Sequence, residues 1–175
     1  LAANWLNMLS VSEVADELRY SVDILDVDLV DLPKRHRGMR AVFDSSWKLL
    51  TSEEQEVFIR LSIFQGGFTR EAAQAVTSCR LHTLSSLVNK SLIQRDIESG
   101  YFSVHELVRQ YGYEKLIATE DLLPIQAAHR DYYLLLMANL VTPLRTSGQL
   151  DALNKIEEAF ENIRIAWEQA ISDAQ

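Results

Sequence analysis

Residues 92–104 read LIQRDIESGYFSV, and this stretch decides the fold. Hydrophobic and polar side chains alternate on both sides of residues 97–100, whereas the segments before and after repeat their hydrophobic residues every three or four positions. A period of two is typical of a half-buried strand, and a glycine in a short connection is typical of a hairpin turn. The sequence therefore predicts a β-hairpin, with strands at 92–96 and 101–104, inside an otherwise helical chain.

Helices are predicted ahead of the hairpin over residues 38–50, 52–64, 70–76 and 79–90. Thr51 and Glu54 have the spacing of a capping box at the start of the second helix, and Thr69 is the expected N-cap of the third. Gly66-Gly67 is expected to end the second helix, because glycine takes the left-handed conformation at little cost. A series of three helices that leads into a hairpin has the order of a winged-helix domain. Residues 79–90, the last helix before the hairpin, are then in the position of the recognition helix.

Helical segments are predicted on both sides of this domain. Ser10 and Glu13 have capping-box spacing ahead of a helix at 11–19, after an earlier helix at 2–9. Further helices are predicted at 105–118, 124–141 and 149–174, the last of them broken near 156–159. The expected fold class is therefore mainly α: residues 1–31 are helices of an upstream domain, 32–118 a winged helix with a small hairpin wing, and 119–175 an α-helical segment resembling tetratricopeptide repeats.

The composition is that of a soluble, folded chain of one or two domains. Of its 175 residues 47% are hydrophobic, and 25 acidic and 17 basic side chains give a net charge of −8. These values exclude a disordered chain, and a single cysteine excludes a disulfide framework. The longest apolar run covers only residues 132–141, too few for a membrane-spanning helix, and no signal peptide is visible. We expect a cytoplasmic protein with no membrane partner, and the start at Leu1 inside an apolar-periodic stretch indicates a segment of something longer.

Sequence patterns for catalysis are missing. The sequence has no Gly-x-x-x-x-Gly-Lys-[Ser/Thr] phosphate loop and no Gly-x-Ser-x-Gly elbow, so this segment is not expected to be an enzyme. Cys79 and His82 have a spacing that could seat two metal ligands, but no further Cys or His lies near them in the sequence. Because a zinc site needs at least three protein ligands, we expect no metal site and a semi-buried cysteine instead.

His105 lies at the junction between the second strand of the wing and the next helix. A histidine beside the exposed N–H groups of a helix N-terminus can take part in an anion site. The alternative from spacing alone is a structural histidine whose ring bonds a loop carbonyl. Basic residues gather elsewhere, in residues 34–50, which carry five basic side chains and one acidic one. Segment 34–40 is expected to be a solvated helix start or a contact to an acidic surface; the alternative is a phosphate contact.

Residues 104–111, VHELVRQY, resemble the Met-His-Asp motif of the NB-ARC or STAND signalling ATPases, in the form common in bacterial regulators. Further segments resemble parts of the same family in the same order: residues 32–47, 61–69 and 84–92, and the pattern Asn162-Ile163-Arg164 with Ala166-Trp167. Val104 stands in place of the motif's Met and Glu106 in place of its Asp. The family's phosphate-binding loop, metal-holding acids and adenine contacts would all lie upstream of Leu1.

The resemblance implies that the winged helix closes onto an upstream nucleotide-binding domain of the same chain and that His105 contacts the β-phosphate of bound ADP. Arg40, inside one of the matching segments, is the candidate for an auxiliary phosphate or interdomain contact. The cofactors implied are ADP or ATP with Mg for the full-length parent, and none for this segment. The implied partners are that nucleotide domain, a downstream helical-repeat sensor and an inducer or protein that the sequence does not identify. Since ADP would gain its histidine contact only in the closed arrangement, it would favour closure.

The sequence thus predicts a regulatory winged-helix switch module that holds the ADP-bound resting state of a STAND ATPase, in a bacterial transcriptional regulator. The first alternative is a DNA-binding winged helix, with a recognition surface made by the outward side chains of the fourth helix: Arg80, His82, Thr83, Ser85, Ser86, Asn89 and Lys90. We do not expect direct DNA binding by this segment, because its basic residues are sparse and its flanks are acidic. The second alternative is a stand-alone helical protein-interaction domain.

Overall fold

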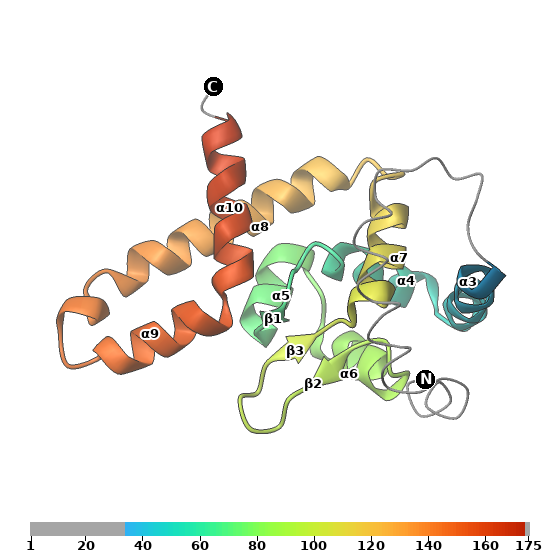
Figure 1. Ribbon diagram of the computed structural model, residues 1–175, viewed down its shortest axis with the longest axis horizontal. Coiled ribbons are helices and arrows are strands. Elements are labelled where there is room, and N and C mark those ends of the chain that lie inside the picture. The colour runs from blue at the N-terminus through green and yellow to red at the C-terminus, as the bar shows by residue number, and fades with distance from the viewer. Residues whose placement is uncertain (1–33, 174–175) are drawn as a thin grey trace. The chain divides into compact units, whose positions relative to one another are not determined.

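The computed structural model describes residues 34–173 (Figure 1). Its helices are α3 (Lys34–Lys48), α4 (Ser52–Leu61), α5 (Arg70–Thr77), α6 (Leu81–Asn89), α7 (Glu106–Leu116), α8 (Leu122–Leu140), the 3₁₀ helix η2 (Pro143–Arg145), α9 (Gln149–Glu158) and α10 (Phe160–Asp173). Its strands are β1 (Gly67–Phe68), β2 (Gln94–Arg95) and β3 (Phe102–Ser103). The fold is mainly helical with a small sheet, as predicted. The helices predicted at 2–9 and 11–19, the Ser10–Glu13 capping box and the proposed domain 1–31 lie outside the described residues.

The contacts divide the chain into two compact units, Leu1–Ser46 and Trp47–Gln175, which are described separately. In the first unit, the described part is the helical backbone of α3 up to Ser46, which begins four residues before the predicted start at 38. All other elements belong to the second unit. No helix within residues 34–173 has the length and apolarity needed to cross a bilayer.

The predicted capping box fixes the start of α4. The backbone N–H of Thr51 donates to Glu54 Oε2 at 2.7 Å, and the N–H of Glu54 donates to Thr51 Oγ1 at 3.3 Å. These reciprocal bonds satisfy two of the N–H groups that a helix N-terminus leaves without partners. Thr69 caps α5 in the predicted way, since its hydroxyl accepts from the N–H of Ala72 at 3.1 Å.

The end of α4 differs from the prediction. The helix ends at Leu61 rather than near residue 64, and Gly66, five residues after Leu61, forms the following turn with a φ of +76°. This turn leads into β1, a strand that the sequence analysis did not predict. Strand β1 pairs antiparallel with β3, with Gly67 opposite Ser103 and Phe68 opposite Phe102. The sheet therefore has three strands in the order β1-β3-β2.

The predicted hairpin is confirmed. Strands β2 and β3 pair antiparallel, with Gln94 opposite Ser103 and Arg95 opposite Phe102. Gly100 closes the turn with a φ of +75°, in the left-handed region where glycine has no Cβ penalty. The Asp96 carboxylate accepts hydrogen bonds from the N–H groups of Glu98 and Ser99, and these bonds lower its pKa. This hairpin is the wing of the domain.

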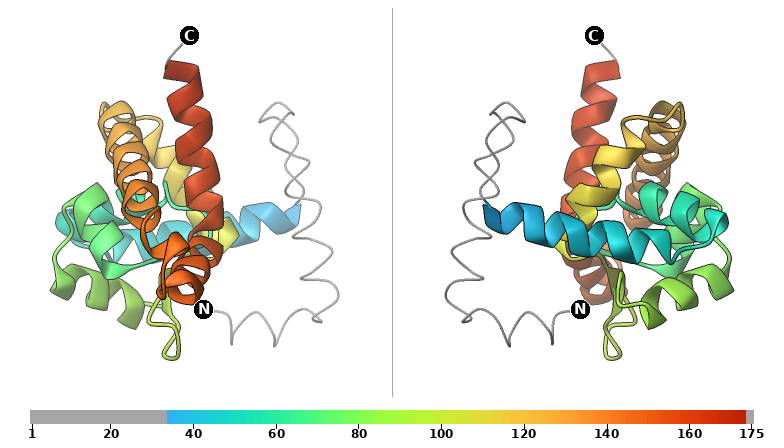
Figure 2. Two further views of the ribbon diagram at one scale, coloured as in Figure 1. Left: turned by 90° about the vertical axis from the view of Figure 1, so that its left-hand side faces the viewer. Right: turned by 90° about the vertical axis from the view of Figure 1, so that its right-hand side faces the viewer.

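The C-terminal helices pack onto the winged helix. Helix α10 packs against α8, and α8 packs against α5 (Figures 1 and 2). The predicted break in the last helix is present at Ala159, which separates α9 from α10. A continuous row of aromatic rings joins α8 to the sheet. Phe64 lies 5.4 Å from the ring of His129, 6.3 Å from Tyr133 and 4.5 Å from Phe68, measured between ring centroids.

Candidate functional site

Helix α6, which stands in the position of a recognition helix, uses much of its polar side inside the molecule. Thr83 Oγ1 donates to Glu53 Oε1 at 3.0 Å, and Ser86 Oγ donates to Glu54 Oε1 at 2.5 Å. Lys90 Nζ donates to both carboxylate oxygens of Glu54 at 2.7 Å. These residues are three and four positions apart, so they form one stripe along α6 and its C-cap residue, Lys90, that faces the start of α4.

Glu54 is the centre of this network. Glu54 is only 7% exposed. Its carboxylate accepts hydrogen bonds from Lys90, from Ser86 and from the N–H of Thr51 at the start of α4. The hydrogen bond from Lys90, followed by those from Ser86 and Thr51, lowers its pKa to about 2. The charge therefore stays on Glu54 at physiological pH and holds α6 to α4 by charge-assisted hydrogen bonds.

The buried and exposed faces of α6 differ in part from the prediction. Leu84 and Leu87 are fully buried as expected, but Thr83, expected to face outward, is 1% exposed, and Leu81, expected to face inward, is 53% exposed. The reason is that the carboxylates of α4 supply polar partners for one side of α6, so polar residues occupy positions that a helical period assigns to solvent. The DNA-reading surface of the first alternative thus loses Thr83, Ser86 and Lys90 to internal contacts.

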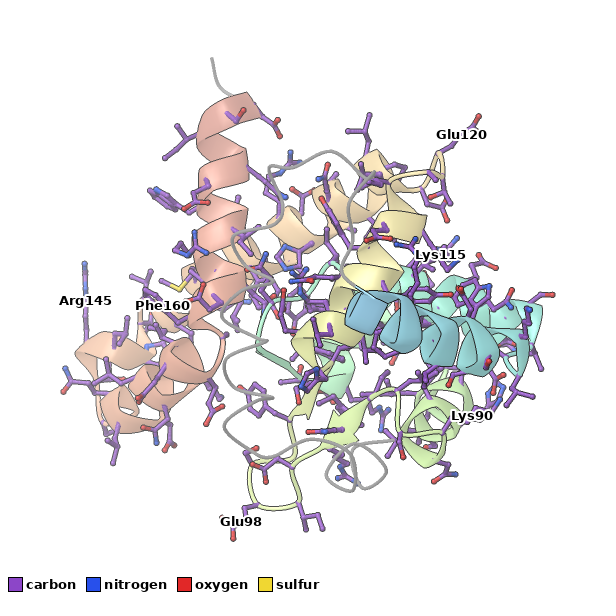
Figure 3. The ribbon with its side chains drawn as sticks, turned by 45° about the vertical axis from the view of Figure 1, so that its right-hand side comes forward. Lys90, Glu98, Lys115, Glu120, Arg145 and Phe160 are labelled. Atoms are coloured by element: carbon purple, nitrogen blue, oxygen red, sulfur yellow. The ribbon has the colours of Figure 1, made fainter. Side chains whose placement is uncertain are left out.

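A groove of about 550 Å³ lies between the remaining face of α6, the start of α5 and the wing. Its lining includes Arg70, Glu71 and Arg95, and the Arg95 guanidinium lies 5.7 Å from the centroid of the Phe102 ring. The tip of the wing beside it is acidic, and Figure 3 shows Glu98 at that tip, pointing away from the sheet. Charges of both signs thus face this groove.

His105 occupies the predicted junction. It is the residue before the first turn of α7, two positions after β3 ends at Ser103, and its side chain is exposed and makes no capping hydrogen bond. Its backbone carbonyl accepts from the N–H groups of Val108 and Arg109 at 2.9 Å each. The neighbouring carboxylate of Glu106 is held by Arg109 at 2.7 Å and by Gln110 at 2.9 Å.

The guanidinium of Arg109 connects this junction to α4. Its Nη1 donates to the carbonyl oxygen of Ser62 at 3.2 Å while its Nε and Nη2 donate to Glu106. The first turn of α7 is therefore fixed to the end of α4, and His105 is presented to solvent from a rigid position. Arg40, the other predicted site residue, is exposed on α3 in the first unit.

The cysteine and histidine considered as metal ligands face in different directions. Cys79 is buried, and burial raises the pKa of its thiol, whereas the His82 side chain is 66% exposed and lies 3.8 Å from Glu53. Within residues 34–173, no group of three or more His, Cys, Asp or Glu side chains is arranged to hold a metal ion.

The geometry agrees with the comparison to known families. A family described as a winged helix-turn-helix domain matches residues 50–117. Residues 50–117 form a winged helix-turn-helix domain. Proteins of Mycobacterium bovis and of two Mycobacterium tuberculosis strains, provisionally named HTH-type transcriptional regulators, are each 34% identical to the chain over 175 residues. The match covers 95% of this chain and 20% of each relative, so the chain spans about a fifth of the length of these relatives.

A likeness to one solved structure is weaker. A signal transduction ATPase with numerous domains (STAND) from Pyrococcus horikoshii, which has a tetratricopeptide repeat sensor, is 17% identical with a TM-score of 0.48. The likeness covers 81% of this chain and 22% of that protein.

Two polar residues that the sequence analysis gave no role lie where the winged helix meets the C-terminal helices. Asn162 and His129 are both fully buried and lie 3.1 Å apart, from Asn162 Oδ1 to His129 Nε2. Asn162 was visible as part of a motif, but its partners are more than 30 residues away in the sequence. Only the fold brings them together.

Proposed function

We propose that this chain is the regulatory winged-helix module of a STAND-type signalling ATPase, within a bacterial transcriptional regulator. In this proposal the module closes onto a nucleotide-binding domain elsewhere in the parent protein and stabilises the ADP-bound resting state. His105 contacts the ADP phosphate, and Arg40 serves as an auxiliary phosphate or interdomain contact. Residues 119–175 begin a helical sensor for an inducer or a protein partner.

The observation that carries the proposal is the position of His105. The exposed imidazole stands at the N-terminus of α7, where backbone N–H groups and the positive end of the helix dipole favour an anion. The Arg109 bonds to Ser62 and Glu106 hold this turn in place, so the ring needs little reordering to meet a phosphate. The sequence around it, residues 104–111, supports the same role through its resemblance to the family motif.

The internal contacts of α6 support a protein-facing rather than a DNA-reading role. Thr83, Ser86 and Lys90 already bond the carboxylates of α4, and the exposed start of the helix presents the apolar Leu81. In this proposal the segment itself is not an enzyme and does not bind nucleotide tightly alone. The parent supplies ADP or ATP with Mg, and acts in the cytoplasm.

Replacement of His105 tests the proposed phosphate contact. In the full-length protein, His105→Ala is expected to weaken ADP retention about tenfold or more, since a charge-assisted hydrogen bond contributes about 1.5–3 kcal/mol, and to raise basal regulatory output. The measurement is the dissociation rate of a fluorescent ADP analogue. The matched control is His82→Ala, which removes another exposed histidine of the same domain. Wild-type ADP retention and basal output in the His105 variant would show that the proposed role is wrong.

The DNA-binding alternative makes a separate prediction. Fluorescence anisotropy with a random DNA duplex at low salt is expected to show no more than weak binding by the 175-residue chain. Binding that is tight and falls steeply with added salt would favour the alternative, because that dependence reports released counterions from phosphate contacts.

A further inference from the structure

The side chain of Asn162 in α10 makes three hydrogen-bond contacts, two with the segment that enters β1 and one with α8. Its Oδ1 accepts from the backbone N–H of Gln65 at 2.9 Å, and its Nδ2 donates to the backbone carbonyl of Gly67 at 2.9 Å. Its Oδ1 also lies 3.1 Å from Nε2 of His129 on α8. The amide itself is fully buried, and the contact with His129 is buried as well.

The bonds to the backbone determine the state of the histidine. Because the Gln65 N–H and the Gly67 carbonyl fix which end of the Asn162 amide is oxygen, His129 must donate from Nε2. Its Nδ1 is then unprotonated, and it is buried without a hydrogen-bond partner. The loop before β1, α8 and α10 therefore share one set of directed hydrogen bonds.

Strand β1 has little room to shift while this arrangement holds. A Cβ at Gly67 would lie 3.2 Å from Cδ1 of Tyr101 and 3.7 Å from the carbonyl oxygen of Glu158. The strand is thus enclosed by the wing on one side and by the end of α9 on another. A side chain at position 67 would therefore force Tyr101 to shift.

The same strand leads directly to the candidate phosphate contact. Gly67 pairs with Ser103 in β3, and Ser103 lies two residues before His105. Aromatic packing also joins the two strands, since the ring centroids of Phe68 in β1 and Phe102 in β3 lie 6.1 Å apart. Only one strand pairing separates the Asn162 amide from the segment that carries His105.

We propose that Asn162 is a positioning residue that couples the docking of α10 to the segment carrying His105. While α10 is docked, its amide holds β1 against β3; when α10 moves away from α8, β1 loses this support and the end of β3 loosens. The meaning of the coupling for ADP rests on the function proposed above for His105, whereas the coupling between α10 and the sheet stands independently of it.

Hydrogen–deuterium exchange of the 175-residue chain tests this coupling. In Asn162→Ala we expect the amides of residues 65–68 and 102–105 to exchange about tenfold faster or more, because a tenfold change corresponds to about one lost net hydrogen bond. Amides of α6, which is held by α4, keep wild-type exchange. Asn154→Ala is the matched control, because it removes an exposed asparagine of α9. This control is expected to leave both segments unchanged.

A second variant separates coupling from a simple loss of stability. Ala166 is fully buried one helical turn after Asn162, so Ala166→Val is expected to push α10 from its place with the Asn162 side chain intact. It should accelerate exchange in the same two segments. The proposal is overturned if residues 102–105 keep wild-type protection in both variants, or if every helix loses protection equally.

The two proposals fail separately. Exchange in this chain involves no nucleotide, so it reports only whether α10 supports the sheet. ADP retention in the full-length His105→Ala protein reports only whether His105 contacts the nucleotide. If Asn162→Ala accelerates exchange while His105→Ala leaves ADP retention unchanged, the coupling stands and the proposed function does not.

Discussion

A buried histidine makes the junction between the C-terminal helices and the winged helix sensitive to acid. Burial, partly opposed by the bond to Asn162, lowers the pKa of His129 to about 4 from a usual value of 6.5. The unfolded chain therefore binds a proton as the pH falls below about 6.5, while the folded chain resists protonation until about pH 4. The stability contributed by neutral His129 is complete above pH 6.5 and is lost progressively between pH 6.5 and pH 4.

Urea unfolding at two pH values measures this effect. Lowering the pH from 7 to 5 is expected to reduce the free energy of unfolding by about 2 kcal/mol through His129. The carboxylate of Glu54 contributes little in this range, because the stability that it supplies is lost mainly between its usual pKa of 4.5 and its folded pKa of about 2. His129→Phe should remove the dependence and His82→Ala should retain it. Equal stability of the wild-type chain at both pH values would contradict the prediction.

At the scale of elements, the contact between α4 and α7 depends on a missing side chain. A Cβ at Gly112 of α7 would lie 3.1 Å from both Phe58 Cε1 of α4 and Cβ of Ser62, the residue after α4 ends. Alanine is favoured over glycine in a helix by about 1 kcal/mol, but the overlap forces a buried phenylalanine or the helix itself to move, at about 1–3 kcal/mol.

Gly112→Ala is therefore expected to lower the stability of the chain by about 1 kcal/mol despite its better helix propensity. Thermal or urea unfolding checks the change. Gly148→Ala is the matched control, since a Cβ there meets nothing closer than 3.6 Å, in Pro143. A Gly112 variant more stable than the wild type would show that α4 and α7 can separate without loss.

The elements that could be predicted from the sequence are those with local signals. The capping box joins residues three positions apart, and the turn of the wing contains its own glycine, so both were confirmed. Strand β1 has two residues and no alternation of its own, and its partners in β3 lie 34 and 36 positions away, so nothing nearby in the sequence indicated it. Thr83 was predicted to face solvent, because the helical period of its own segment does not show the carboxylate that accepts its hydrogen bond. That carboxylate belongs to Glu53 on another helix.

The candidate site divides in the same way. His105 could be placed at a strand–helix junction from its own segment, and the structure has it there. The hydrogen bonds of Asn162 could not be predicted, because they reach Gln65 and Gly67, 97 and 95 residues away along the chain. A motif can identify such an asparagine, but only the folded chain shows what its amide bonds.

At the scale of the whole molecule, the matched domain ends at residue 117, yet its core continues beyond that point. Phe64 packs on His129 and Tyr133 of α8, and Arg60 of α4 bonds Asp121 at 2.8 Å and 3.0 Å. Helices α8 and α10 therefore complete the packing of the second unit.

Deletion of residues 119–175 is expected to destabilise the winged helix by about 3 kcal/mol or more. Phe64 loses the rings that bury it, and the Gln65 N–H and the Gly67 carbonyl lose their hydrogen bonds to Asn162. Urea unfolding followed by circular dichroism measures the difference. An unchanged unfolding midpoint and slope would show that the winged helix is independent of the C-terminal helices.

The bonds of Asn162 also limit how this chain can be engineered. A planar amide there offers an oxygen to one backbone N–H and a nitrogen to one backbone carbonyl, and aspartate, leucine or serine cannot supply both. A chimera that grafts this winged helix onto a different helical array therefore needs an asparagine at the matching point of the new array. The grafted boundary would be defined by a pair of hydrogen bonds rather than by the end of a domain.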